Sequence, residues 1–306
     1  NAAHAERVWS RMERDVFPAI GEKLVHEITA PDVLAMIRKI EARGALDISR
    51  RAKQGVGQVF QFAIACGLAS NDPTTHLRGA LKPRPRVKHM SRLPLSELPA
   101  FIEKLHVYQE EGERRSSITR DAVLFALLTW VRTKELRFAA KSEFEDLGGK
   151  SPVWRIPAER MKMGREHLVP LSQQATHIAK SMIAAAPGEF LFPGNGPNKP
   201  LSENTMIYAL YRLGYHSRQT VHGFRGLAST WANEQLVEFG KPPMWIRKYH
   251  EDWVELQLAH SEKNDVRGAY NAAEYLAPRR RMMQDWADYL SGGKVIDIKK
   301  AGKRAA

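Results

Sequence analysis

Two pairs of side chains near the C-terminus have types suited to chemistry on a phosphodiester. His260 and Tyr270 lie a short stretch apart, and His222 and Arg225 form a His-x-x-Arg arrangement upstream. A tyrosine hydroxyl can act as a covalent nucleophile, while arginine and histidine supply the charge and the donors that an anionic phosphodiester requires. On a strongly basic chain, this combination indicates breaking and rejoining of DNA through a phosphotyrosine.

The overall composition bounds the class of protein. The chain has 306 residues, 43% of them hydrophobic, which is enough for two domains and a substantial core. Its 47 Lys and Arg exceed its 34 Asp and Glu, giving a net charge of +13. Such an excess favours a polyanionic partner, although a basic enzyme without a nucleic-acid role would share it. The motifs must separate these possibilities.

The number of cysteines and the lack of long apolar segments indicate the cellular compartment of the protein. Cys66 is the only cysteine, which excludes a disulfide within the chain and a Cys-rich zinc site. It lies in an apolar run, so we expect a buried thiol. The sequence shows no membrane-spanning stretch and no signal peptide, and these features favour the cytoplasm. The chain starts without methionine, which indicates a fragment of a longer protein.

The chain divides into a smaller helical part and a larger mixed part. We expect a mainly α protein with a small antiparallel β-sheet, arranged as a helical domain (1–81), a basic linker (82–94), a larger domain (95–292) and a disordered basic tail (293–306). Thr29, Pro31 and Asp32 signal the start of a helix that Gly44 closes, whereas Pro18 is expected to interrupt an earlier one.

The larger domain alternates helices with one hairpin. Residues 153–157 and 167–171 are strand candidates flanking a turn at 161–166. Helices are expected over 121–131, 172–186, 202–213 and 222–238. Near the C-terminus, Trp286, Tyr289 and Leu290 form an apolar stripe that either docks on a neighbouring protomer or packs on its own domain.

Basic side chains in the first third are candidates for contacts with DNA phosphates. A solvated helix face explains the helical cluster equally well, but a linker has less need of so many cations. The candidates are Arg50, Arg51, Lys53, Lys82, Arg84, Arg86 and Lys88.

Four separated segments carry the candidate active-site residues: 129–137 with Arg132, 160–164 with Lys162, 222–225, and His260 with Tyr270. In this order they resemble the tyrosine recombinase superfamily, and most closely the integrases of prophages and genomic islands. The runs 154–163, 169–172, 255–260 and 269–276 are also similar to that family. The resemblance covers nearly the whole chain and implies a helical core-binding domain followed by a tyrosine-recombinase catalytic domain.

The resemblance also implies a role for each residue. Arg132 and Arg225 are the two arginines that clamp the phosphate, and Lys162 is the hairpin lysine that acts as general acid. His222 and His260 are the two histidines of the site. Tyr270 is the nucleophile, and Glu135 is a supporting acid. From the residues alone, alternatives remain. Arg132 and Glu135 could form an ordinary surface ion pair, Lys134 and Arg165 rival Lys162, and Tyr275 is a packing residue near Tyr270.

The chemistry of the reaction explains these residue types. Charge builds on the non-bridging phosphate oxygens, and each preorganised donor there contributes about 3 kcal/mol. Arginine stays protonated and binds such oxygens in pairs. The tyrosine hydroxyl, with an ordinary pKa of about 10, must lose its proton, and a histidine can take it. The reaction needs no metal, ATP or other cofactor, and no acidic cluster suited to a metal stands out.

The chain departs from the family pattern at three points. Trp130 replaces a small residue before the first arginine, and Lys141 stands where tryptophan is common. From the resemblance we also expect this chain to begin within the core-binding domain, without the N-terminal arm-binding domain of such integrases.

Partners and rival functions follow from the resemblance. It implies double-stranded DNA attachment sites, a homotetramer on DNA, an accessory DNA-bending protein, a directionality factor and action at the bacterial nucleoid. Relaxation of DNA by a type IB topoisomerase uses similar chemistry and is one rival. A non-catalytic architectural protein derived from an integrase is the other.

Overall fold

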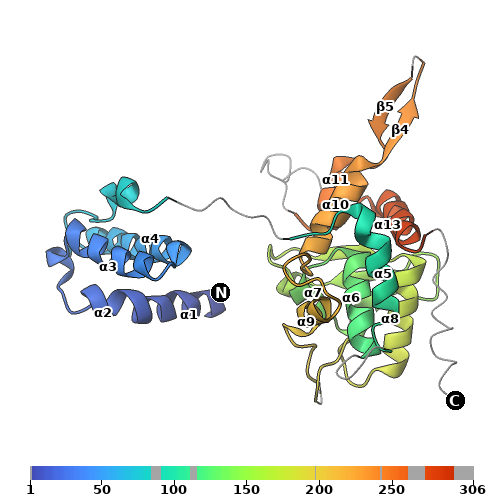
Figure 1. Cartoon of the computed structure of the whole chain (residues 1–306), viewed down its shortest axis with the longest axis horizontal. Coiled ribbons are helices and arrows are strands. Elements are labelled where there is room, and N and C mark those ends of the chain that lie inside the picture. The colour runs from blue at the N-terminus through green and yellow to red at the C-terminus, as the bar shows by residue number, and fades with distance from the viewer. Residues whose placement is uncertain are drawn as a thin grey trace. The chain divides into compact units, whose positions relative to one another are not determined.

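The chain folds into two compact units, residues 1–88 and 89–306, each around a hydrophobic core of its own (Figure 1). The computed structural model describes residues 2–83, 91–110, 116–196, 198–241, 243–260 and 273–292. Helices dominate both units and the strands are short and antiparallel, which confirms the predicted fold class. No helix among these described residues is both long and apolar enough to cross a bilayer.

The N-terminal unit is a helical bundle. Its elements are α1 (Ala2–Arg11), a π-turn (Met12–Val16), α2 (Phe17–Ile20), a 3-10 turn (Val25–Glu27), α3 (Ala30–Ala42), α4 (Leu46–Ala65) and a second 3-10 segment (Thr75–Ala80). The predicted start of α3 is confirmed, because Thr29 and Asp32 form a reciprocal capping box. Buried Ile37 and Phe60 lie in the core between α3 and α4.

Two expectations for this unit are wrong. Pro18 does not end the helical run, which continues without a break from α1 through the π-turn into α2, and Pro18 lies in the first turn of α2. Cys66 is exposed rather than buried, because α4 ends there and the apolar run around it is split between two faces. Phe60 and Ala63 point inward, whereas Phe62 is 71% exposed.

The C-terminal unit contains the remaining elements. They are a 3-10 turn (Leu95–Glu97), α5 (Leu98–His106), α6 (Ser117–Thr129), α7 (Thr133–Arg137), a 3-10 turn (Lys141–Glu143), β1 (Phe144–Glu145), β2 (Val153–Ile156), a 3-10 turn (Ala158–Arg160), β3 (His167–Pro170), α8 (Gln173–Ala185), α9 (Thr205–Arg212), α10 (Gly223–Glu234), β4 (Leu236–Phe239), β5 (Met244–Arg247), α11 (Glu251–Gln257) and α13 (Leu276–Leu290).

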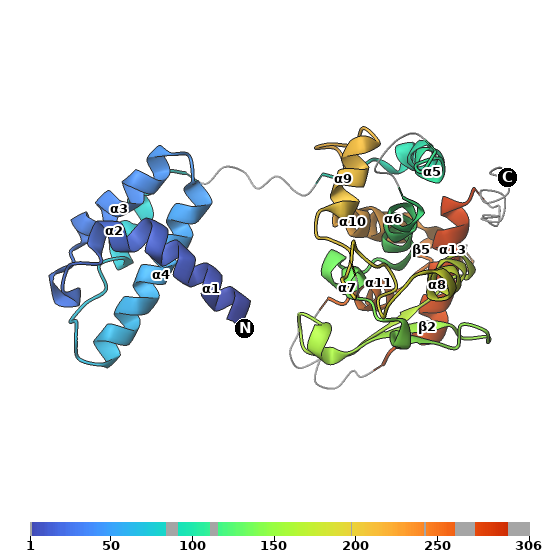
Figure 2. The same cartoon turned by 90° about the horizontal axis from the view of Figure 1, so that it is seen from below.

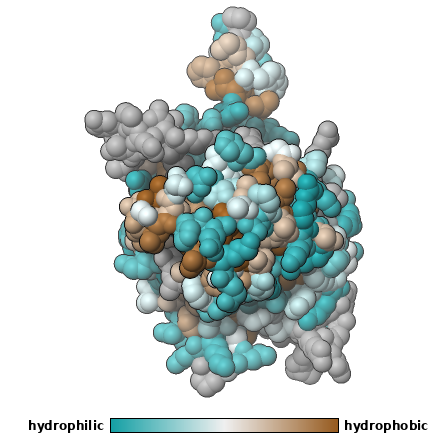
Figure 3. All heavy atoms as spheres, turned by 90° about the vertical axis from the view of Figure 1, so that its left-hand side faces the viewer, coloured by the Kyte–Doolittle hydropathy of each residue, from teal (hydrophilic) through white to brown (hydrophobic). Residues whose placement is uncertain are grey.

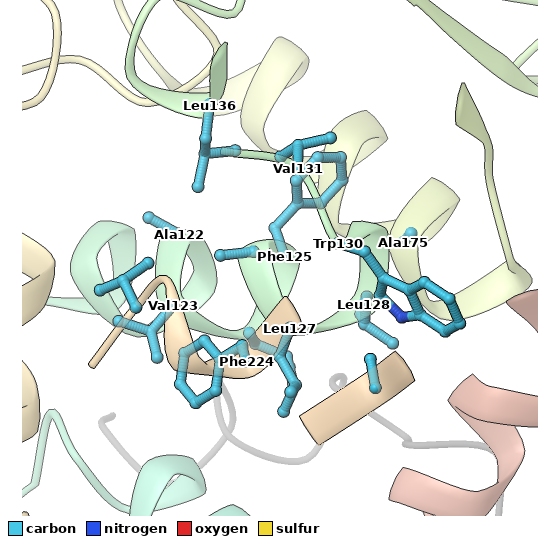
Figure 4. Close-up of a cluster of buried hydrophobic side chains, with 14 of the residues drawn as sticks. Ala122, Val123, Phe125, Leu127, Leu128, Trp130, Val131, Leu136, Ala175 and Phe224 are labelled. Atoms are coloured by element: carbon cyan, nitrogen blue, oxygen red, sulfur yellow. The ribbon is translucent and has the colours of Figure 1, made fainter. Parts of the chain in front are cut away.

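Helix α6 is the centre of this unit, with α5, α8, α9, α10 and α13 packed around it (Figures 1 and 2). Its residues from Thr119 to Thr129 are buried on every side, as expected for a helix that is apolar all round. Figure 4 shows Phe125, Leu128, Trp130 and Val131 of this region side by side in the core. The end of α6 is therefore a rigid platform for the residues after it.

The predicted hairpin is confirmed as part of a three-stranded antiparallel sheet in the order β1-β2-β3. Its central pairs include Trp154 opposite Val169 and Phe144 opposite Trp154. Inward and outward residues alternate along β2, so Trp154 and Ile156 are buried. Phe144 stacks on Trp154 and fixes the short strand β1.

The helix predicted over 222–238 is shorter than expected. It ends at Glu234, and the chain then forms an antiparallel hairpin of β4 and β5. The β-branched and aromatic residues of 236–247 favour strands, and Gly240, with φ 82°, supplies the turn conformation.

The apolar stripe of α13 packs mainly on its own domain. Trp286 is fully buried and donates from Nε1 to the carbonyl of Leu127, 2.9 Å away. Leu290 is buried as well, while Tyr289 stacks on Trp286 and stays 42% exposed. The interpretation of this stripe as a docking surface is therefore wrong for Trp286 and Leu290.

The last residues before α5 attach to the start of α10. The Ser91 carbonyl accepts from the amide of Thr220, Arg92 donates to the carbonyl of Gly226, and the Leu93 amide donates to Gln219. Residues 84–90 of the predicted linker and the predicted tail lie outside the described residues. The functional domain bounds stay a prediction.

Candidate active site

Three of the four predicted segments meet at one end of α6. Arg132 comes just after α6 and begins α7, His222 and Arg225 lie at the start of α10, and His260 comes after α11. Arg225 Nη2 lies 3.2 Å from His260 Nε2. Arg132 and His222 line one hollow of about 480 Å³ together with Thr133, Lys134, Arg137, Phe138 and Glu203. Residues far apart in sequence thus form one cationic cluster.

Arg132 is fixed by a carboxylate and by a backbone carbonyl. Glu135, which is only 3% exposed, accepts from the Arg132 amide and from its Nη1, both at 2.7 Å. Nη2 donates to the carbonyl of Ala259 at 2.9 Å. The surface-ion-pair alternative does not fit a buried acid, and the geometry matches a carboxylate that orients the guanidinium. Arginine has five N–H donors, so this anchoring is compatible with a bound phosphate.

Arg225 is buried and bonds to the segment that follows α6 and to the segment that follows α11. It donates from Nη1 to the carbonyl of Trp130 and from Nη2 to that of Leu258. Burial, followed by the nearby charge of Arg132, lowers the pKa of Arg225 to about 10. The group therefore still carries its charge at neutral pH. Two adjacent cations held by fixed acceptors are a preorganised anion site.

Two carbonyls that hold the arginines belong to residues in left-handed backbone conformations. Trp130, with φ 62°, ends α6, and Ala259, with φ 48°, ends the turn after α11. Non-glycine residues rarely adopt this conformation, and such strain clusters at functional sites. Here it aims the Trp130 carbonyl at Arg225 and the Ala259 carbonyl at Arg132.

His260 is oriented on both sides of its ring. Because Arg225 can only donate, His260 Nε2 accepts from it at 3.2 Å, and Nδ1 donates to Glu255 at 2.7 Å. A carboxylate on one ring nitrogen fixes the tautomer of a histidine. The ring thus presents an acceptor toward the cluster.

His222 lies at the N-terminus of α10 with its side chain exposed to the hollow. Its pKa is lowered by partial burial and then by the charges of Arg225, Arg132 and His260. Lowering favours the neutral ring near pH 7, which can accept a proton.

The structure does not bring Lys162 into contact with this cluster. Lys162 lies exposed on the turn between β2 and β3, as Arg165 does, and Lys134 lines the hollow. Tyr270 lies outside the described residues, so its role stays a prediction. Tyr275 is described and precedes α13 with φ 44°.

A buried polar network beside the cluster was missed from the sequence. Arg279, fully buried on α13, donates to Gln257 Oε1, to the carbonyl of Glu274 and to that of Leu168 on β3. Gln257 in turn donates to the carbonyl of Thr129 at 3.0 Å. These bonds attach both flanks of residues 258–273 to the platform. A run of arginines on an amphipathic helix gives no signal of which one is buried.

His167 was also missed as a site neighbour. It is buried on β3 with its Nε2 unpaired among the described residues. Burial, followed by the charges of Arg279, Arg225 and Arg132, lowers its pKa to about 3. It is a neutral ring under the arginine cluster.

The two departures within the described residues have structural explanations. Trp130 is fully buried and packs edge-on against Trp286, with ring centroids 6.1 Å apart. Its side chain packs in the core while its carbonyl accepts from Arg225. Lys141 caps the C-terminus of α8 by donating to the carbonyl of Ala186 at 2.5 Å.

The predicted DNA-contact residues differ in their exposure and in their bonding partners. Arg50 donates to the carbonyl of Lys82 at 2.6 Å, and Arg51 pairs with Asp47 at 2.6 Å. Lys53 is half-buried and Lys82 is exposed. Arg84, Arg86 and Lys88 lie outside the described residues. Among the residues that are described, no group of three His, Cys, Asp or Glu side chains could hold a metal ion.

Both units of the chain match models of known protein families. Residues 1–80 match the phage integrase central domain, and residues 92–275 match the phage integrase family. The prophage integrase IntZ of Escherichia coli K12 is 38% identical over 288 residues, covering 94% of this chain and 66% of IntZ. The chain thus spans slightly less than two thirds of that relative.

Solved structures show the same fold at lower identity. A lambda integrase (75–356) dimer bound to a COC′ core site has a TM-score of 0.64 and 17% identity, covering 86% of this chain and 89% of that one. A lambda integrase tetramer bound to a Holliday junction has a TM-score of 0.63 and 17% identity, covering 87% of this chain and 73% of the integrase chain. Because the phage integrase family model matches residues 92–275, more than half of the chain, the chain belongs to the phage integrase family, as its four-segment pattern predicted.

Proposed function

We propose that this chain cuts and rejoins duplex DNA at attachment sites through a covalent 3′-phosphotyrosyl intermediate, and so integrates or excises a mobile element. One observation carries the proposal. Arg132, Arg225, His222 and His260, drawn from three separated segments, meet in one cluster beside a hollow. Membership in the phage integrase family and the tyrosine at position 270 support it.

The arginines bind the scissile phosphate. Their guanidinium groups hold the non-bridging oxygens as charge builds during attack, and their positions are set by Glu135 and by the Trp130 and Ala259 carbonyls. Because these partners are in place before DNA binds, little reorganisation is needed in the transition state.

Proton transfer accompanies the exchange of bonds. The Tyr270 oxygen attacks phosphorus, the bond from phosphorus to the 5′ oxygen breaks, and that oxygen takes a proton from Lys162. His222 or His260 accepts the tyrosine proton. In the second step the 5′ hydroxyl of the partner strand attacks the phosphotyrosine and gives its proton to Lys162. The bond from phosphorus to the Tyr270 oxygen breaks, and the histidine returns its proton to that oxygen. The phosphodiester energy is conserved in the covalent bond, so no cofactor enters.

The assembly is proposed from the likeness to integrases solved on DNA as a dimer and as a tetramer on a Holliday junction. We propose that four copies act on two DNA sites, with Arg51, Lys53 and Lys82 among the phosphate contacts of the N-terminal unit. An accessory DNA-bending protein and a directionality factor complete the proposed assembly. With chromosomal DNA as substrate, we expect action in the bacterial cytoplasm at the nucleoid.

A nicked suicide duplex tests the chemistry. Its sequence is selected by the chain from a randomised duplex library, and the nick lets the cleaved end diffuse away so that the covalent complex accumulates. We expect a protein–DNA adduct that survives denaturation and is absent with Tyr270→Phe. Tyr275→Phe, the matched control, should retain it.

Other outcomes favour the rival functions. DNA binding without an adduct would contradict the proposal and favour an architectural protein. An adduct with supercoil relaxation but without recombinants from paired sites would favour topoisomerase activity.

A further inference from the structure

The β4–β5 hairpin leaves the body of the C-terminal unit between α10 and α11 (Figure 1). Its base is closed by the amide of Lys248, which donates to the carbonyl of Gln235 at 2.8 Å. All eight strand residues are exposed. An isolated two-stranded hairpin is only marginally stable in water, so this one is a candidate for an element that is covered by a partner.

One face of the hairpin is entirely apolar. Phe239 pairs with Met244 across the strands and Val237 with Ile246, and alternation places these four side chains on the same face. Phe239 is 63% exposed and Met244 is 59% exposed. Figure 3 shows hydrophobic side chains gathered on this projection. Exposed apolar patches of this kind mark interaction sites.

The chemistry of this face argues against DNA as its partner. Phosphate backbones are bound by lysine, arginine and backbone amides, and none of the four side chains is charged. The apolar stripe of α13 does not cover the hairpin either, because Trp286 and Leu290 are buried in their own core.

We propose that this apolar face packs against a second copy of the chain bound to the same DNA. This contact between copies rests on the proposed function. Among solved structures of this fold are a dimer on a core site and a tetramer on a Holliday junction, so copies of such chains are placed next to one another by DNA. A protein contact that forms only on DNA explains an apolar surface that the free chain leaves open.

The position of the hairpin links this contact to the active site. It joins α10, which carries Arg225, to α11, which leads to His260. Just beyond its base, Lys248 and Tyr249 both bond to Asp285 of α13. Docking of a second copy would therefore brace the junction between two arms of the arginine–histidine cluster and favour cleavage in the assembled state.

The test separates DNA binding from contact between copies. Duplexes carrying one or two copies of the library-selected sequence are titrated with wild-type protein and with the double variant Phe239→Ser/Met244→Ser. We expect the affinity for the single-copy probe to stay within about twofold, while cooperative binding to the two-copy probe falls about tenfold or more. Leu24→Ser, which alters an equally exposed side chain of the N-terminal unit, should change neither.

Three results would overturn the proposal. Unchanged cooperativity in the double variant would show that the hairpin is not the contact. A parallel loss of single-copy affinity would assign it to DNA. An absence of cooperativity in the wild type would also contradict it. A lowered melting temperature would make the serine variants uninformative, so a second measurement uses Phe239→Cys in a Cys66→Ser background. A thiol-linked photocrosslinker on Phe239→Cys should join two copies only on the two-copy probe.

Strand cleavage is measured separately from the contact between copies. Adduct formation on a nicked single-copy probe reports the proposed strand cleavage without a second copy. If the wild type forms no adduct yet binds cooperatively through the hairpin, the recombinase proposal fails and the contact stands. The reverse result leaves the chemistry standing and removes the contact.

Discussion

At the scale of single residues, the cluster depends on the planar geometry of its arginines. Arg225 uses separate nitrogens to reach the Trp130 and Leu258 carbonyls, which a lysine ammonium cannot do from one position. We expect Arg225→Lys to lower the rate of adduct formation roughly 100-fold, with DNA affinity little changed. Quenched-flow measurement on the nicked duplex gives the rate.

A second arginine serves as the control for that prediction. Arg155 is 41% exposed in its side chain and pairs with Glu145, so Arg155→Lys should leave the rate unchanged. Equal losses in both variants would mean that the effect reflects general charge or stability instead of the geometry of the clamp.

His167 makes a residue-scale prediction about pH. Its pKa is about 3 when folded and about 6.5 when unfolded. The unfolded state therefore binds more protons in this window, so stability falls as pH drops below about 6.5, by up to about 1.4 kcal/mol per pH unit. His167→Gln removes this dependence on pH, so its free energy of unfolding should change less between about pH 6.5 and pH 5, where most carboxylates stay ionised. Urea unfolding at each pH measures this free energy. If it changes equally with pH in the two proteins, His167 does not have the lowered pKa.

At the scale of elements, α13 connects the residues on either side of the segment that contains the proposed nucleophile. Arg279 bonds to Gln257 before that segment and to the Glu274 carbonyl after it. Arg279→Met keeps the volume but leaves the buried Gln257 Oε1 and two carbonyls without their donor, so we expect a lower melting temperature. At a temperature where the variant remains folded, we expect unchanged DNA affinity but about a 100-fold slower adduct rate, because small misplacements of a reacting group are costly.

The neighbouring Arg280 provides the comparison for α13. It is partly exposed and donates to the carbonyl of Pro152, so Arg280→Met should retain the rate. Partial recovery in Arg279→Lys would support positioning by hydrogen bonds. A rate that falls only in proportion to the unfolded fraction would reduce Arg279 to a stability role.

Sequence reasoning succeeded where local rules decide the structure. The capping box at Thr29 and the alternation in 153–156 depend on near neighbours. The family pattern selected Arg132, Arg225 and His260, which the structure brings together, while their roles stay predictions. It failed where tertiary context decides. Whether 236–247 continues the helix or forms a hairpin depends on the pairing of two segments across Gly240. Which arginine of 279–281 is buried, and that the Trp130 and Ala259 carbonyls hold the clamp, become visible only in the folded chain.

At the scale of the whole molecule, the separate cores predict two unfolding transitions. Ile37 is fully buried in the N-terminal unit and Leu210 in the C-terminal unit. A buried Leu or Ile replaced by Ala costs about 3 kcal/mol through lost burial and the cavity left behind. Ile37→Ala should shift one calorimetric transition of the full chain and Leu210→Ala the other. DNA that bridges both units should raise both transitions together, because a ligand bound only by the native state stabilises it. If either substitution moves both transitions in the free chain, the units unfold as one, and the division at residue 88 has no thermodynamic meaning.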